Sequence, residues 1–81
     1  MNPRYLAYCS AHGMTPEAMA EHDEVRWPGG RMAGFILWMS EQSRKFFKAH
    51  PEAFSKGWNG VPDPYQLSDH SAWDTWLQNQ A

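Results

Sequence analysis

Prolines and glycines fall between the periodic segments of this 81-residue chain and divide it into short pieces, each long enough for one element. Asn2-Pro3 is typical of a helix start, because asparagine caps free N–H groups and proline fits the first helical position. Thr15-Pro16 repeats this signal, and each of the two segments ends at a glycine or a Pro-Gly-Gly turn. The pattern predicts helices over 3–12 and 16–26.

The longest segment runs from 31 to 50, and its apolar side chains gather on about 120° of a helical wheel, the width of a core-facing stripe. The members of this predicted stripe are Met32, Phe35, Ile36, Met39, Ser43, Phe46 and Phe47. A last helix begins after Ser68 or Asp69, because Trp73, Trp76 and Leu77 follow at i, i+3, i+4 spacing. We expect this helix to dock on the central one, with Phe35, Met39, Phe46, Trp73, Trp76 and Leu77 among the most buried residues.

No segment alternates apolar and polar residues, so the sequence predicts no strand. Residues 51–54 are predicted to form one further turn, and 57–67, with two glycines and two prolines, an ordered loop. The expected fold class is therefore all-α: one domain over 1–81, built as a small bundle of about four helices around helix 31–50.

The hydrophobic content and the net charge of the chain limit the classes of function that it can have. The 42% of hydrophobic residues supports a packed core, and a net charge of −2 gives no general affinity for nucleic acid. No run of about 18 apolar residues is present, which excludes a transmembrane helix. With one cysteine and no signal peptide, the chain is expected to be cytosolic.

Cys9 and His12 lie three residues apart, a spacing that places both on one helical face and suits a shared metal ion or a thiol–base pair. No second pair of ligands with such spacing supports a zinc site, and no nucleotide-binding loop or nucleophile motif occurs. The favoured interpretation is a buried cysteine beside a histidine at a helix end. We therefore expect no catalytic residues, no metal and no cofactor, with a small metal or thiol enzyme as the weakest hypothesis.

Helices 16–26 and 31–50 resemble a helix-turn-helix in their order. A recognition helix needs polar residues at its N-terminal end, whereas residues 31–38 are mostly apolar. The preceding helix carries a predicted acidic ridge of Glu17, Glu21 and Glu24 with Asp23 beside it, which phosphates would repel. A plain helical hairpin is favoured, and nucleic acid is an unlikely partner.

Arg44, Lys45, Lys48 and Lys56 form the only cluster of positive charge. It is interpreted either as a solvated helix face or as a binding site for an acidic protein surface. Leu37 and Trp38 fall outside the predicted stripe, so they are either covered by helix 3–12, which favours a monomer, or form an apolar patch for a homodimer. The candidate partner-binding residues are Trp38, Arg44, Lys45, Lys48 and Lys56.

Two stretches carry a family resemblance: the run from Asn2 to Glu17 that holds Asn-Pro-Arg-Tyr-Leu-Ala-Tyr-Cys, Ala-His-Gly and Thr-Pro-Glu, and the run from Trp27-Pro-Gly-Gly to Trp38. Together they resemble a family of small uncharacterised proteins of tailed phages and prophages of Gram-negative bacteria. This resemblance covers about the first half of the chain and assigns no activity or site. It implies an accessory protein that acts in the cytoplasm of the bacterial host by binding proteins.

The resulting expectation is a non-enzymatic phage accessory protein that binds a host or phage protein, such as a component of a host defence system. The lack of a catalytic constellation and the excess of aromatic residues, which are common interface anchors, favour this function. The alternative is a DNA-associated accessory protein with a helix-turn-helix-like hairpin.

Overall fold

The structure is a computed structural model that describes residues 2–80. Within this range the chain forms four helices, a short 3-10 turn and a β-hairpin. The elements are α1 (Pro3–Ala11), α2 (Pro16–Arg26), α3 (Ala33–Ala49), η1 (Pro51–Ala53), β1 (Phe54–Lys56), β2 (Pro62–Leu67) and α4 (His70–Gln78). The predicted helix starts are confirmed, since Asn2, Thr15 and Asp69 each accept a hydrogen bond from a first-turn N–H group.

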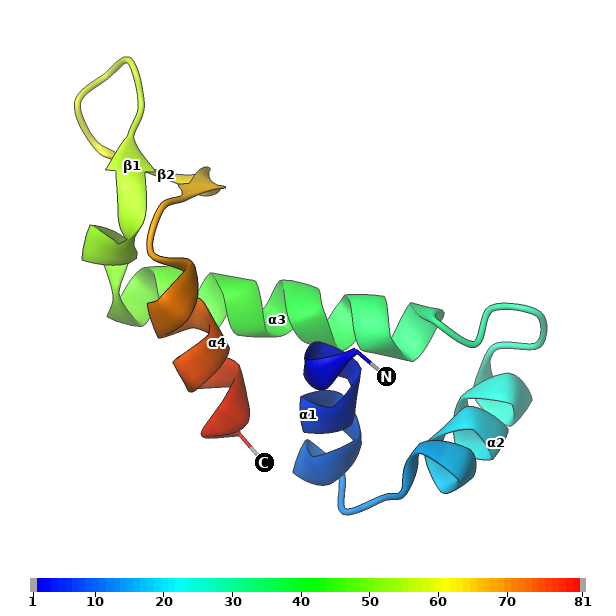
Figure 1. Cartoon of the computed structure of the whole chain (residues 1–81). Coiled ribbons are helices and arrows are strands. Elements are labelled where there is room, and N and C mark those ends of the chain that lie inside the picture. The colour runs from blue at the N-terminus through cyan, green and yellow to red at the C-terminus, as the bar shows by residue number, and fades with distance from the viewer. Residues whose placement is uncertain (1, 81) are drawn as a thin grey trace.

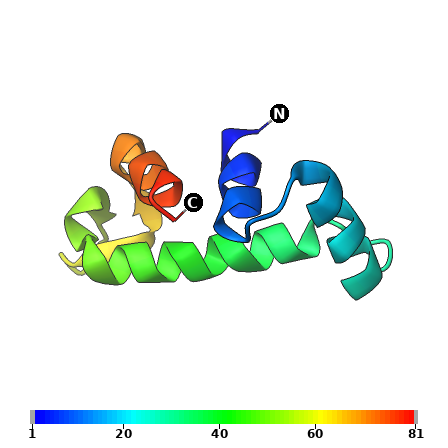
Figure 2. The ribbon, with the colours of Figure 1, turned by 90° about the horizontal axis from the view of Figure 1, so that it is seen from below.

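The long helix α3 is the axis of the molecule, with α1, α2 and α4 along one side of it and the hairpin rising from its C-terminal end (Figure 1). A view turned by 90° again places α1 and α4 on one side of α3 (Figure 2). The molecule is elongated, with extents of 44 × 23 × 19 Å and a radius of gyration of 14.5 Å. A compact chain of this length would have a radius of gyration of about 12 Å. One flank of α3 therefore has no helix packed against it.

At the N-terminal half of α3, helix α1 packs across Gly34, and Tyr8 of α1 lies close to the Gly34 backbone. The Tyr8 ring of α1 lies 5.7 Å from Phe35 and 5.6 Å from Trp38, between ring centroids. A Cβ atom on Gly34 would lie 2.5 Å from the Tyr8 hydroxyl, 2.8 Å from Trp27 and 3.1 Å from an Asp23 oxygen. Glycine is thus required here because α1 and α2 both press against the α3 backbone.

At the other end of α3, Phe46 is the centre of an aromatic cluster that joins α3, α4 and the hairpin. Its ring lies 5.2 Å from Trp73, 5.6 Å from Trp76 and 5.7 Å from Phe54. The indole N–H of Trp76 donates a hydrogen bond to the Gln42 Oε1 atom at 3.1 Å. The predicted docking of the last helix on the central one is confirmed.

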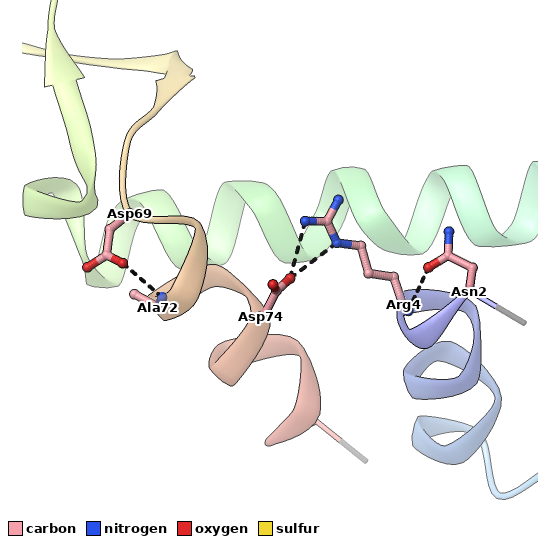
Figure 3. Close-up of polar contacts among 5 residues, drawn as sticks. All are labelled: Asn2, Arg4, Asp69, Ala72 and Asp74. Atoms are coloured by element: carbon pink, nitrogen blue, oxygen red, sulfur yellow. Dashed lines mark hydrogen bonds and ion pairs between the residues drawn. The ribbon is translucent and has the colours of Figure 1, made fainter.

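The two ends are also tied directly, because Arg4 of α1 reaches Asp74 of α4 (Figure 3). The Arg4 Nε and Nη2 atoms lie 3.3 and 3.2 Å from Asp74 Oδ1. Both side chains are well exposed, so this ion pair contributes little stability by itself. It bridges helices that are 70 residues apart in sequence.

The all-α expectation is wrong, because the segment predicted as a loop contains an antiparallel hairpin. Phe54 pairs with Leu67 and Lys56 with Pro62, with an irregularity in the register between the two pairs. The turn closes with Gly60 in the left-handed region, at a φ of 78°, and its N–H bonds to the Gly57 carbonyl. The hairpin projects from the body, so neither face of β2 is buried enough to produce the alternation that reveals a strand.

The predicted buried stripe of α3 is rotated from the observed one. The buried residues are Gly34, Trp38, Gln42 and Phe46, which follow one another at every fourth position. Met32 and Ile36 are exposed. A helical wheel that counts apolar residues does not predict that Gly34 and Gln42 are buried. Gly34 is buried because Tyr8 packs against it, and Gln42 because Trp76 donates a hydrogen bond to it.

The predicted core is confirmed for Phe46, Trp73 and Leu77, which are buried. Phe35, Met39 and Trp76 were also predicted to be among the most buried residues, but they pack against the core while remaining only partly buried. The expected cover by the first helix holds for Trp38, which is 8% exposed, but not for Leu37, which is 59% exposed.

Gly34→Ala should destabilise the fold by about 1–3 kcal/mol through overpacking, although glycine to alanine within a helix normally stabilises it. The free energy of unfolding in urea measures this effect. Gly30→Ala is the matched control, because the nearest atoms to a Cβ there lie 3.7 Å away. Equal stability of the Gly34 variant and the wild type would show that the three helices do not meet as described.

Candidate functional site

The structure separates the predicted partner-binding residues into two groups. Trp38 is buried beneath α1, so it supports the fold and offers no surface to a partner. Arg44, Lys45, Lys48 and Lys56 are all exposed, the first three on α3 and the last on β1. The four basic residues are thus accessible to a partner, whereas Trp38 is not.

The exposed aromatic residues belong to the hairpin, which sequence reasoning missed. Trp58 in the turn is 100% exposed and Tyr65 on β2 is 93% exposed. A signal for Trp58 was present, because Gly57-Trp58-Asn59-Gly60 is a turn sequence and turns lie on the surface.

Exposed apolar side chains concentrate on α3 and the hairpin. Between residues 2 and 80, the large exposed hydrophobic residues there are Met32, Ile36, Leu37, Trp58, Val61 and Tyr65, and elsewhere they are Leu6 and Val25. Those of α3 and the hairpin form two groups, one at the N-terminal end of α3 and one on the hairpin, and grouped apolar residues mark an interaction surface more often than scattered single residues do.

A hollow of about 490 Å³ lies between α3 and β2, lined by Ser40, Ser43, Arg44, Phe47, Pro64 and Tyr65. Ile36 and Leu37 precede Ser40 by four and three residues, so they adjoin this hollow along the same side of α3. We name this surface, formed by Ile36, Leu37, Ser40, Arg44, Pro64 and Tyr65, the open face. It combines apolar area with a guanidinium group, the composition of a protein interface.

The hairpin is protected against the addition of another strand. Pro62 and Pro64 have no N–H group, and the Tyr65 N–H already bonds to Asp63 Oδ1 at 2.9 Å. β1 has only three residues. A partner would therefore contact side chains of the hairpin, since half of the N–H positions on β2 cannot pair with it.

A second polar cluster lies between α1 and α2, around Asp23. This carboxylate is fully buried and so does not extend the acidic ridge of Glu17, Glu21 and Glu24, which is exposed as predicted. The Tyr8 hydroxyl donates to its Oδ2 atom at 2.9 Å, and His22 Nδ1 lies 3.0 Å from its Oδ1 atom. Burial and the hydrogen bond to Asp23 raise the pKa of the Tyr8 hydroxyl. Both carboxylate oxygens are thus engaged, and the cluster joins helices.

The favoured interpretation of Cys9 and His12 is confirmed, since Cys9 is buried and His12 is the C-cap residue of α1. Cys9 is buried, and this burial raises the pKa of its thiol. His12 Nδ1 lies 2.9 Å from the carbonyl oxygen of Tyr8. Within residues 2–80, no group of three His, Cys, Asp or Glu side chains is placed to hold a metal ion.

No family model, curated protein or solved structure matches the chain. Among the helices described, none is long and apolar enough to cross a membrane. The function proposed below therefore rests on the arrangement of the described residues alone.

Cys9 should react with a thiol-specific disulfide reagent far more slowly in the folded protein than in urea at neutral pH. Burial blocks access, and the raised pKa lowers the thiolate fraction at pH 7. The rate of release of the chromophore measures the reaction, with free cysteine as the reference. A folded protein that reacts as fast as free cysteine would restore thiol chemistry as a candidate function.

Proposed function

We propose that the chain is a protein-binding module that uses the hairpin turn and the open face to engage a host or phage protein. The bacterial cytoplasm is the proposed location, and host defence systems are among the proposed targets. The proposed mode of action is binding by a monomer, without catalysis, metal or cofactor.

The observation that carries this proposal is the complete exposure of Trp58 at the end of a hairpin that projects from the body (Figure 1). A tryptophan side chain is large and apolar, and leaving it in water forgoes about 1.5–3 kcal/mol of burial. Tryptophan and tyrosine are also the residues that most often dominate the energy of interfaces.

The hairpin is rigidly attached, which makes it suitable for binding. Phe54 at its base is buried against Phe46 and Phe47, with ring centroids 5.7 and 5.0 Å away. At the same base, just after β2 ends, the backbone N–H groups of Ser68 and Asp69 both bond to the Ala53 carbonyl. An anchored hairpin loses less conformational entropy on binding than a mobile loop would.

A protein partner is favoured over nucleic acid by the character of the surface. Ile36, Leu37 and Val61 add aliphatic area that suits a protein interface and that phosphates would not contact. The net charge of −2 and the exposed glutamates of α2 oppose a polyanion.

Trp58→Ala should weaken binding of the partner by at least about tenfold, because a central tryptophan contributes about 2 kcal/mol or more to such an interface. The immobilised full chain is used to capture proteins from lysates of Gram-negative bacteria, with and without phage infection. Calorimetry with the purified captured protein then measures the affinity.

Val25→Ala is the matched control, because Val25 is an 83% exposed apolar residue on α2, away from the hairpin. This variant should bind like the wild type, and circular dichroism should show both variants folded. Equal affinities of Trp58→Ala and wild type, or no specific capture, would contradict the proposed function.

A further inference from the structure

We propose that the open face binds an acidic amphipathic helix of the partner, laid along α3. This inference rests on the proposed function and names the chemistry of the partner segment. It follows from the free side chains of the open face, from its length and from the blocked strand.

The apolar part of the open face lies at its N-terminal end. Ile36 and Leu37 are exposed there, and Tyr65 of β2 stands beside the next turn of α3 at Ser40. Ile36 and Leu37 are 60% and 59% exposed, and Leu37 also borders a second hollow that residues of α1 and α2 line. The helices α1 and α4 lie on another side of α3 (Figure 2). The row from Ile36 to Ser40 therefore offers an apolar contact about one helical turn long.

The charged part has free donors, with Arg44 and Lys48 farther along α3 and Lys56 on β1. Within residues 2–80, Arg44, Lys48 and Lys56 make no ion pair, whereas Lys45 pairs with Glu41 at 3.0 Å. Arg44 also lines the hollow beside Tyr65. These three cations are thus available to an outside group, and Arg44 is the one beside Tyr65.

The carboxylates near this surface are already engaged. Asp63 accepts hydrogen bonds from the Tyr65 N–H at 2.9 Å and from Gln66 Nε2 at 3.2 Å. Glu41 pairs with Lys45, and Glu52 lies 3.1 Å from His50 Nδ1. Asp63 keeps its negative charge, because both of its donors are neutral, whereas Lys45 offsets Glu41. The cations Arg44, Lys48 and Lys56 outnumber Asp63 and Glu52, so carboxylates of a partner complement this surface.

Spacing selects a helix as the form of the acidic segment. Arg44 follows Ile36 by eight residues and Lys48 follows Arg44 by four, which correspond to about 12 Å and 6 Å along α3. A helix beside α3 repeats this spacing on one of its own faces. A strand is disfavoured, because Pro62, Pro64 and the bonded Tyr65 N–H block pairing along β2.

Charge reversal at two adjacent positions tests the acidic character. Arg44→Glu should lower the affinity for the captured partner at least tenfold, whereas Lys45→Glu, the same change of net charge one residue away, should lower it less than threefold. Calorimetry with the full chain measures both, and circular dichroism confirms that both variants fold. Equal effects of the two variants would overturn the acidic assignment.

Photocrosslinking identifies the partner segment. Leu37→p-benzoylphenylalanine in the full chain is irradiated with the captured partner, and the linked peptide is sequenced. The expected peptide has apolar residues three or four apart and two or more Asp or Glu residues one turn apart. A neutral or basic segment, a nucleic acid or a second copy of this chain as the linked species would each overturn the inference.

The two proposals can fail separately. If Trp58→Ala binds the partner as well as the wild type does, the proposed function fails and this inference fails with it. If Trp58→Ala weakens binding but Arg44→Glu and Lys45→Glu act alike, only the acidic helix is excluded.

Discussion

The hydrogen bond from the Tyr8 hydroxyl to the buried Asp23 carboxylate, made across the bare backbone of Gly34, is the contact on which the architecture depends. It joins α1 to α2 at the point where both meet α3. A buried carboxylate that lost this donor would cost about 1–3 kcal/mol or more, a large share of the stability of a small domain. The contact fixes the side of α3 on which the first two helices lie, and so determines which flank remains uncovered.

The aromatic cluster around Phe46 plays the corresponding part at the other end of α3. Trp73 and Trp76 bring α4 to the same side as α1, and Phe54 fixes the base of the hairpin. An elongated molecule with one-sided cover follows (Figures 1 and 2). Ile36, Arg44 and Tyr65 remain exposed on α3 and the hairpin. The proposed binding surface is thus a consequence of how a small core is arranged around a long helix.

The sequence predicts those elements that local chemistry determines. Asn2-Pro3 and Thr15-Pro16 place α1 and α2 almost to the residue, because capping and proline geometry act within one turn. The hairpin was missed because Pro62 and Pro64 read as breakers, although an exposed strand tolerates them. Tertiary contacts decide the burial of Trp38 and Asp23, so no local pattern distinguishes them from exposed neighbours. The basic half of the proposed binding surface was visible in the sequence, and an exposed Leu37 was one of two alternatives, but the exposure of Ile36 and Tyr65 required the fold.

The five tryptophan indole N–H signals in a nitrogen-15 NMR spectrum provide the most direct test of a division between a structural side and a binding side. On titration with the captured partner, the signal of the fully exposed Trp58 should shift. The signals of the buried Trp38 and Trp73 should stay in place. A titration that moves the Trp38 and Trp73 signals and leaves that of Trp58 unchanged would contradict this division.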